Sequence, residues 1–215
     1  MGKAFFFSIC FFFFVACTNS EADKTKEPEV ANPSVSENSS TAIETALPDV
    51  FHYFGRQDTS FSATNFQLAF EDSIEALPPG TLNKEELKPY FPYFIYNRDS
   101  SQAIDMYSYN ILLSNKNGSI VGEAAGPDSE VALLDFKANT RRRLLFGGPS
   151  LAVLDAAWLN DKIILIAGAE IVNDEQLKPI IWKIDPVNHK RETFFYSDTL
   201  TASVLQYEDK RIHIR

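Results

Sequence analysis

The thiol of Cys17 is the side chain whose position most clearly predicts chemistry. It closes the apolar stretch FFFFVAC at residues 11–17, and the only other cysteine, Cys10, lies just before that stretch. If the apolar leader is removed during export, Cys17 remains alone and no intramolecular disulfide can form. A single thiol in an exported protein needs a use, and covalent lipidation is a sufficient one.

The run that precedes this cysteine has the length of a leader. Residues 4–16 are almost wholly apolar and follow the short positive start Met1-Gly2-Lys3. As a helix the run would be about 20 Å long, which is less than the roughly 30 Å hydrocarbon core of a bilayer. It fits the hydrophobic region of a secretory signal peptide. An ordinary signal peptide with an incidental cysteine, or a short membrane anchor, is the alternative interpretation.

Phe14-Val15-Ala16-Cys17 resembles the lipobox of bacterial lipoproteins, although leucine is usual where Phe14 stands. The resemblance implies that Cys17 receives a diacylglyceryl group and that residues 1–16 are cut off as a lipoprotein signal peptide. The new amino terminus would then take a further acyl chain such as palmitate. Several acyl chains would give stable anchoring without a protein span. Thr18 stands where an aspartate would signal inner-membrane retention, which implies the outer membrane.

Residues 17–48 are predicted to be a disordered tether that carries lipidated Cys17. They contain no aromatic residue and few aliphatic ones, so they cannot bury enough apolar surface to offset the entropy of ordering. A single mainly β domain is predicted at residues 49–215. Glu21 and Asp23 resemble the acidic export signal of surface lipoproteins of the Bacteroidetes, and both a periplasmic and a surface-facing orientation stay open.

Other groups that could do chemistry are sparse. His52, His189 and His213 are far apart, and neither a His-x-x-x-His pair nor a Gly-x-Ser-x-Gly elbow occurs. With Cys17 expected to carry lipid, we predict no catalytic residue, no metal ligand and no cofactor site. The net charge of −9 argues against nucleic acid as a partner, because phosphates call for a basic face.

Charged and aromatic clusters each have a structural interpretation beside a functional one. The carboxylates of Glu71, Asp72, Asp128 and Glu130 are predicted to be turn or surface residues, with an acid–base pair as the alternative. The triplet Arg141-Arg142-Arg143 is interpreted as a solvated strand start that blunts an edge, with a site for an anion or an acidic partner as the alternative. Trp158 and Trp182 are expected to pack in strands rather than to form a ligand platform.

The elements that must position these groups are mainly strands. Residues 64–77 fit a strand or a helix, and residues 83–88 fit a short helix. From residue 104 onward, short apolar stretches alternate with turns, beginning with residues 106–113 before an Asn-Gly hairpin turn at residues 117–118. This pattern predicts an antiparallel meander that packs into one mainly β domain.

An internal repeat supports the meander. LLDFKANTRRRLLF at residues 133–146 aligns with KIDPVNHKRETFFY at residues 183–196, at an offset of about fifty residues. Each unit reads as strand, turn and strand, with Asp135 or Asp185 placed to cap free backbone amides in the turn. The units resemble the blades of TolB-type β-propellers. The chain holds too few blades for a closed ring, so an open sheet, a sandwich or a partial propeller is expected.

These observations favour a lipid-anchored cell-envelope protein whose β-rich domain binds an envelope protein or a glycan without catalysis. An envelope hydrolase that uses carboxylates is one alternative. A structural envelope component is another, in which an unpaired sheet edge such as residues 211–215 pairs with a second chain.

Overall fold

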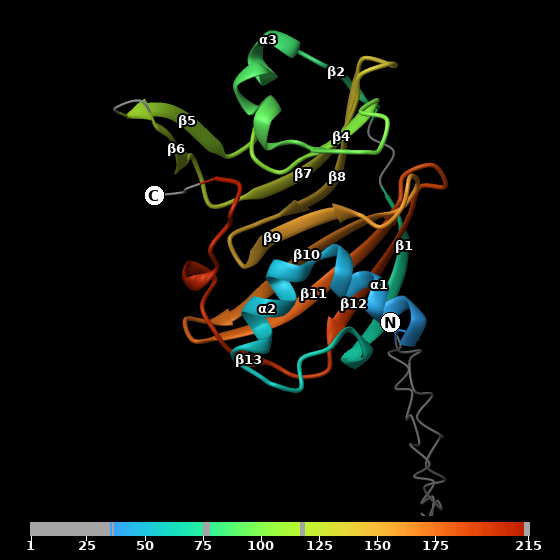
Figure 1. Cartoon of the computed structure of the whole chain (residues 1–215), viewed down its shortest axis with the longest axis vertical. Coiled ribbons are helices and arrows are strands. Elements are labelled where there is room, and N and C mark those ends of the chain that lie inside the picture. The colour runs from blue at the N-terminus through green and yellow to red at the C-terminus, as the bar shows by residue number, and fades with distance from the viewer. Residues whose placement is uncertain (1–34, 36, 75–77, 117–118, 213–215) are drawn as a thin grey trace, which may run out of the picture. The chain divides into compact units, whose positions relative to one another are not determined.

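The computed structural model describes residues 35, 37–74, 78–116 and 119–212, all within the compact unit Asn32–Arg215. Its fold is mainly β, with antiparallel open sheets, as the sequence predicts (Figure 1). The helical elements are α1 (Glu37–Ala46), α2 (Pro48–Gly55), α3 (Lys84–Leu87) and the short 3-10 turns η1 (Ala63–Asn65), η2 (Lys88–Tyr93) and η3 (Val204–Gln206).

The strands form three antiparallel groups. The large sheet has the order β1 (Phe66–Ser73), β12 (Lys190–Tyr196), β11 (Gln176–Asp185), β10 (Ile164–Asn173) and β9 (Leu151–Trp158), and β13 (Leu200–Thr201) also pairs with β11. The small sheet has the order β2 (Gly80–Thr81), β8 (Thr140–Gly147), β7 (Ser129–Asp135), β4 (Gln102–Asp105) and β3 (Ile95–Tyr96). A separate hairpin joins β5 (Ile111–Lys116) to β6 (Ser119–Ala124).

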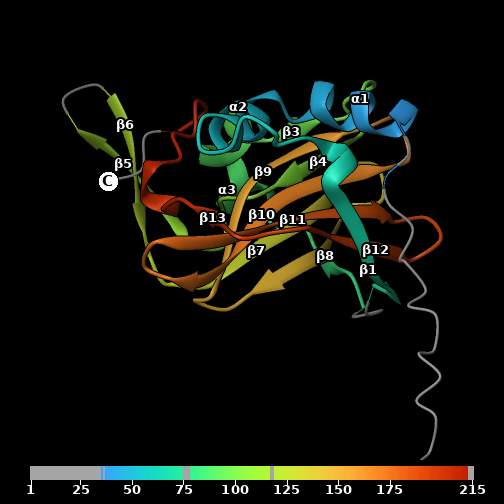
Figure 2. The ribbon, with the colours of Figure 1, turned by 90° about the horizontal axis from the view of Figure 1, so that it is seen from below.

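The large sheet is covered on both faces. Along β10, Ile164 and Ile166 contact one core cluster, whereas Leu165 and Ala167 contact another, as the alternation of a strand requires. The first cluster lies between the large and small sheets, and the second lies under α1 and α2. Figure 2 shows these two helices along one face of the large sheet. Strands β10 and β11 therefore lie at the centre of the fold.

The folded unit begins earlier than the boundary predicted at residue 49. Helix α1 lies within the predicted tether, and Ile43 and Leu47 are buried at 4 % and 0 % exposure. Ile43 lies on α1 and Leu47 at the bend between α1 and α2, and both pack with Val50 and Phe54 of α2 on the large sheet. The two apolar residues suffice because α2 supplies the rest of the buried surface. The other residues of the predicted tether up to 36 are, apart from Val35, outside the described residues.

The repeat predicted from sequence is confirmed as two matching hairpins, β7–β8 and β11–β12. In each, the aspartate that ends the first strand accepts hydrogen bonds in the turn, Asp135 from Ala138 N at 2.7 Å and Asp185 from Asn188 N at 3.0 Å. The last turn residue has φ of 55° in both, at Asn139 and His189. The two turns therefore have the same backbone conformation, and an aspartate side chain stabilises each of them.

His189 is the costlier of these two left-handed residues, and replacing it with glycine should stabilise the protein. Glycine adopts positive φ without the steric penalty of a Cβ, so we expect His189→Gly to raise the free energy of unfolding by about 0.5–1 kcal/mol. Asn139→Gly should raise the free energy of unfolding by a smaller amount, because asparagine tolerates this conformation better. Urea unfolding of both variants and of His189→Ala measures the effect. A gain in His189→Ala equal to that in His189→Gly would contradict this explanation.

Other predictions are confirmed or corrected locally. Within the ambiguous residues 64–77, Phe66–Ser73 form the strand β1 and residues 75–77 lie outside the described residues. Residues 83–88 contain the short helix α3, which Asn83 caps. The strand predicted at residues 106–113 begins only at Ile111, because Asp105 accepts hydrogen bonds from the amides of Tyr107 and Ser108 and turns the chain. The Asn-Gly turn at residues 117–118 lies outside the described residues, between the paired ends of β5 and β6.

The predicted terminal edge strand is also corrected. Arg211 and Ile212 are not in a strand, and Ile212 is buried at 5 % exposure beside β5 and β6. Residues 213–215 lie outside the described residues. The described part of this segment is therefore anchored in the core and does not present an unpaired edge.

Candidate functional site

The structure separates the residues that sequence analysis singled out. Cys17 and His213 lie outside the described residues, and His52 and His189 are exposed on α2 and in the β11–β12 turn. Within the described part of the chain, no three histidine, cysteine or acidic side chains gather where a metal ion could be held. Trp182 is buried in β11, and Trp158 in β9 donates its indole N–H to the carbonyl of Ile95 at 2.9 Å, so both tryptophans pack in strands.

Two arginines of the triplet, Arg141 and Arg143, form an ion-pair network, whereas Arg142 donates to the carbonyl of Pro186 at 3.0 Å. Arg141 and Arg143 both bind the carboxylate of Glu130, the latter at 2.6 Å, and Arg141 also lies 3.5 Å from Asp105. Glu130 was predicted to be a surface residue, yet it is buried at 2 % exposure, because two guanidinium groups compensate its charge. The predicted solvated strand start is therefore wrong for Arg141, and the anion that these arginines bind is the protein's own Glu130.

A groove runs along β9 and has a volume of about 880 Å³. One wall is formed by residues 151–154 of β9, and the opposite wall by residues 204–209 of the C-terminal segment together with Ile212. Residues around β5 and β6 close it on a third side. We call this cavity the β9 groove. Its volume is within the range of ligand sites, and most of its lining residues are apolar.

The groove lies over an edge of the large sheet. Among the described residues β9 pairs only with β10, so its other side is the outermost edge of that sheet. Successive side chains of a strand point to opposite faces, and a cavity that touches four consecutive residues must therefore lie along the strand's edge. At Ala156 the edge is capped, because the carboxylate of Asp155 accepts a hydrogen bond from the Ala156 amide at 2.7 Å. The Leu151 amide donates to the carbonyl of Gly148 at 2.9 Å, so the open stretch of edge runs from the Leu151 carbonyl to Leu154.

Polar contacts hold the C-terminal wall in place. The carbonyl of Ser203 accepts a hydrogen bond from the Tyr53 hydroxyl at 2.6 Å, and the rings of Tyr53 and Tyr207 meet edge to face with centroids 5.5 Å apart. At the other end the Tyr107 hydroxyl donates to Asp209 at 2.6 Å. The segment is therefore fixed to α2 on one side and to the loop before β5 on the other.

A buried charge cluster closes the end of this wall. Arg211 forms an ion pair with Asp155, whose side chain is 8 % exposed, and lies 3.6 Å from Asp209. Burial raises the pKa of Asp155 to about 6, because loss of solvation exceeds the attraction of Arg211. Burial, reinforced by the neighbouring acids, also raises the pKa of the Tyr207 hydroxyl far above its usual value. Burial also raises the pKa of the Tyr107 hydroxyl, so both tyrosines are neutral and Tyr107 donates to Asp209.

The raised pKa of Asp155 makes stability depend on pH. The folded pKa of about 6 lies above the ordinary value of an aspartate, so the folded state binds this proton more tightly and loses stability as rising pH removes it. Relative to Asp155→Asn, we expect the wild-type free energy of unfolding to fall by about 2 kcal/mol between pH 4.5 and 7.5. Urea unfolding at steps of pH measures this, with exposed Asp174→Asn as the control. A constant difference across this range would show that the pKa is not raised.

This cluster does not form an evident acid–base site. The Oδ1 atom of Asp155 binds both Arg211 and the Ala156 amide, and the two oxygens of Asp209 bind Arg211 and Tyr107. Asp155 does not line the β9 groove, whereas Glu208 and Asp209 are the only charged residues that do. The arrangement therefore offers an apolar groove with an acidic end, where Asp209 is already engaged and Glu208 is exposed and has no ion pair in the described part of the chain.

The sequence analysis missed this groove. Its walls come from β9 and from residues about fifty positions later, and no motif links them. The nearest signal is a faint similarity of residues 207–212 to residues 158–163. The sequence predicts an edge strand at residues 211–215, whereas Ile212 lines the groove together with residues 204–209.

Comparisons with known proteins assign no relative to this chain. No protein-family model, curated protein or solved structure matches it. Within the described residues, no helix is long and apolar enough to cross a bilayer.

Proposed function

We propose that this protein is a lipid-anchored envelope protein, held on the outer membrane through Cys17, whose β domain binds a protein or glycan partner without catalysis. The observation that carries the binding role is the β9 groove, an apolar cavity of about 880 Å³ beside an open strand edge. Apolar cavities with a few polar groups at one end are the usual form of ligand sites. The anchor rests on the sequence alone, on the lipobox-like residues that end at Cys17.

An envelope hydrolase is the second candidate, and one observation favours it. Asp155, with a pKa near 6, lies in a cluster with Asp209 and two tyrosines, and perturbed carboxylates are frequent in active sites. The binding role is favoured because Arg211 and a backbone amide occupy Asp155 and keep it out of the groove lining. Buried ion pairs of purely structural function perturb pKa values in the same way.

The anchor is tested by substituting the cysteine. The protein is expressed with its own leader in a diderm bacterium as wild type, Cys17→Ser and Cys10→Ser, and membranes are separated from soluble fractions. We expect wild type and Cys10→Ser in the membrane, and Cys17→Ser to lose mature membrane-bound protein and to fail to incorporate labelled palmitate. Protease added to intact cells then distinguishes a surface-facing domain from a periplasmic one. Labelling of Cys17→Ser equal to wild type would reject lipidation at this residue.

The binding role is tested in the same cells by photo-crosslinking. A photoreactive amino acid is placed at Leu205, which lines the groove and is 92 % exposed, or at Val187, which is 70 % exposed in the β11–β12 turn. Illumination should give a discrete adduct from position 205 and none of the same mass from position 187. The absence of any adduct from position 205 would count against a partner in the groove.

A further inference from the structure

We propose that the β9 groove binds an extended apolar segment of a partner polypeptide, which adds as a strand to the edge of β9 and places a lysine or arginine beside Glu208 and Asp209. This inference rests on the proposed binding function and names the class of its partner. It follows from three features of the groove: its edge, its two apolar sides and its charge.

The edge supplies backbone hydrogen-bonding groups. Residues 151–154 line the groove and belong to the outermost strand of the large sheet. A peptide laid beside such an edge gains affinity from main-chain hydrogen bonds and specificity from alternate side chains. From the Leu151 carbonyl to Leu154 the open edge spans roughly 10 Å at about 3.3 Å per residue, so the paired core of the ligand is about three residues long. The Asp155 cap on the Ala156 amide ends the pairing on one side.

Both sides of this edge are apolar. Leu154 belongs to the core cluster under α1 and α2, whereas Leu151 and Val153 pack against the cluster between the sheets. Across the groove, Val204 and Leu205 line the cavity with Ile212. Alternate side chains of an added strand would therefore meet apolar surface on either side. A ligand core of consecutive apolar residues fits this environment better than a glycan, which needs many hydrogen-bonding groups.

The charge of the groove selects the residue that flanks this core. Glu208 and Asp209 are its only charged lining residues, and Glu208 is exposed with no ion pair in the described part of the chain. The nearby cations are already engaged, Arg211 by Asp155 and Lys210 by Asp49. A cationic residue on the ligand would find an unpaired carboxylate at this end, and an acidic residue would be repelled.

The test uses the full-length lipidated protein in lipid nanodiscs and a fluorescent peptide, Gly-Ser-Lys-Val-Ile-Val-Leu-Ser-Gly, in an anisotropy titration. We expect the peptide with glutamate in place of lysine to bind about tenfold more weakly. Two further peptides carry N-methyl groups on every second core amide, one on the odd and one on the even positions. One of the two should bind at least tenfold more weakly, because methylation removes the amide donors that face β9 and leaves the side chains unchanged. Leu205→Glu should weaken binding several-fold and Val187→Glu should not, with unchanged unfolding curves for both.

The outcomes separate this inference from the proposed function. If both methylated peptides bind as tightly as the unmodified peptide, strand addition is overturned. If the glutamate peptide binds as tightly as the lysine peptide, the acidic end does not select a cation. If no peptide binds up to 1 mM while the Leu205 adduct persists in cells, the partner is of another class and the binding function stands. If the peptide does not bind and the Leu205 adduct does not form, both the strand addition and the binding function are rejected. An adduct between two copies of this chain overturns the partner polypeptide in favour of self-association.

Discussion

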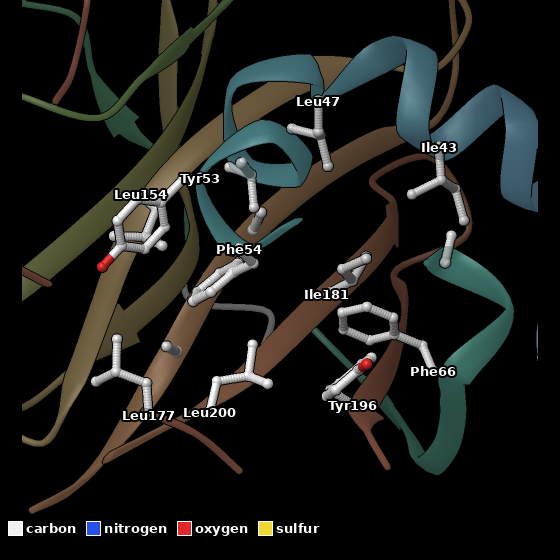
Figure 3. Packing of buried hydrophobic residues seen from close by; sticks show 14 of the residues in the cluster. Ile43, Leu47, Tyr53, Phe54, Phe66, Leu154, Leu177, Ile181, Tyr196 and Leu200 are labelled. Atoms are coloured by element: carbon white, nitrogen blue, oxygen red, sulfur yellow. The ribbon is translucent and has the colours of Figure 1, made fainter. Parts of the chain in front are cut away.

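Phe54→Ala is expected to lower the free energy of unfolding by about 3–5 kcal/mol, the range for removing a large aromatic side chain from a core. Phe54 is 0 % exposed and points from α2 toward the large sheet, where Leu154 and Ile181 lie (Figure 3). Its ring also meets those of Tyr53 and Phe61, with centroids 4.9 Å and 5.1 Å away. Alanine would leave a cavity at the point where the helical layer joins the strands, and urea unfolding at pH 7 measures the loss.

The control is another phenylalanine, whose side chain buries much less surface. Phe70 in β1 is 48 % exposed, and its nearest ring, that of Phe195, is 6.4 Å away. We expect Phe70→Ala to cost less than about 1 kcal/mol, since much of its surface already contacts water. If Phe54→Ala proved as mild as Phe70→Ala, the helical layer would not be part of the cooperative core.

The hairpins were predictable because their determinants are local. Asp135 and Asp185 occupy equivalent positions fifty residues apart, and each caps its own turn. The continuous apolar runs of β10 and β11 likewise indicate strands that are buried on both faces. Such features need no information about the rest of the chain, so the antiparallel, mainly β class and the strand–turn–strand units were predicted correctly.

The N-terminal helices were harder to predict because their stability is tertiary. Residues 37–46 are polar apart from a few aliphatic side chains, and a helix of this length is marginal in isolation. It is ordered because Ile43 and Leu47 reach a surface that β10, β11 and α2 create together. Composition alone made this segment part of the tether, since composition does not report what a segment can pack against.

The candidate groove was unpredictable for a related reason. Asp155 meets Arg211 across 56 positions, and Tyr107 meets Asp209 across 102. The fact that β9 is an edge strand is set by the order of the large sheet, which a meander pattern leaves open. The buried Glu130 was missed because its arginine partners lie on the neighbouring strand, where cross-strand register decides the contact.

Arg211→Leu should lower the free energy of unfolding by about 3 kcal/mol at pH 7.5 and by much less at pH 5. Removing one partner of a buried ion pair leaves the other charge uncompensated, and Asp155 is 8 % exposed. The pKa of Asp155 is already about 6, and without Arg211 this pKa should rise further. At pH 5 the carboxyl group of the variant is therefore neutral, and no uncompensated charge lowers its stability. Urea unfolding of wild type and variant at both values of pH measures the difference.

The adjacent lysine provides a matched control. Lys210 pairs with Asp49, but its side chain is 71 % exposed, so Lys210→Leu should change stability by less than about 1 kcal/mol at either pH. The double variant Arg211→Leu with Asp155→Asn should recover most of the loss at pH 7.5, because no uncompensated carboxylate remains. If the double variant were as unstable as Arg211→Leu, the loss would come from packing of the arginine side chain. The C-terminal wall of the β9 groove would then be held by contacts other than this ion pair.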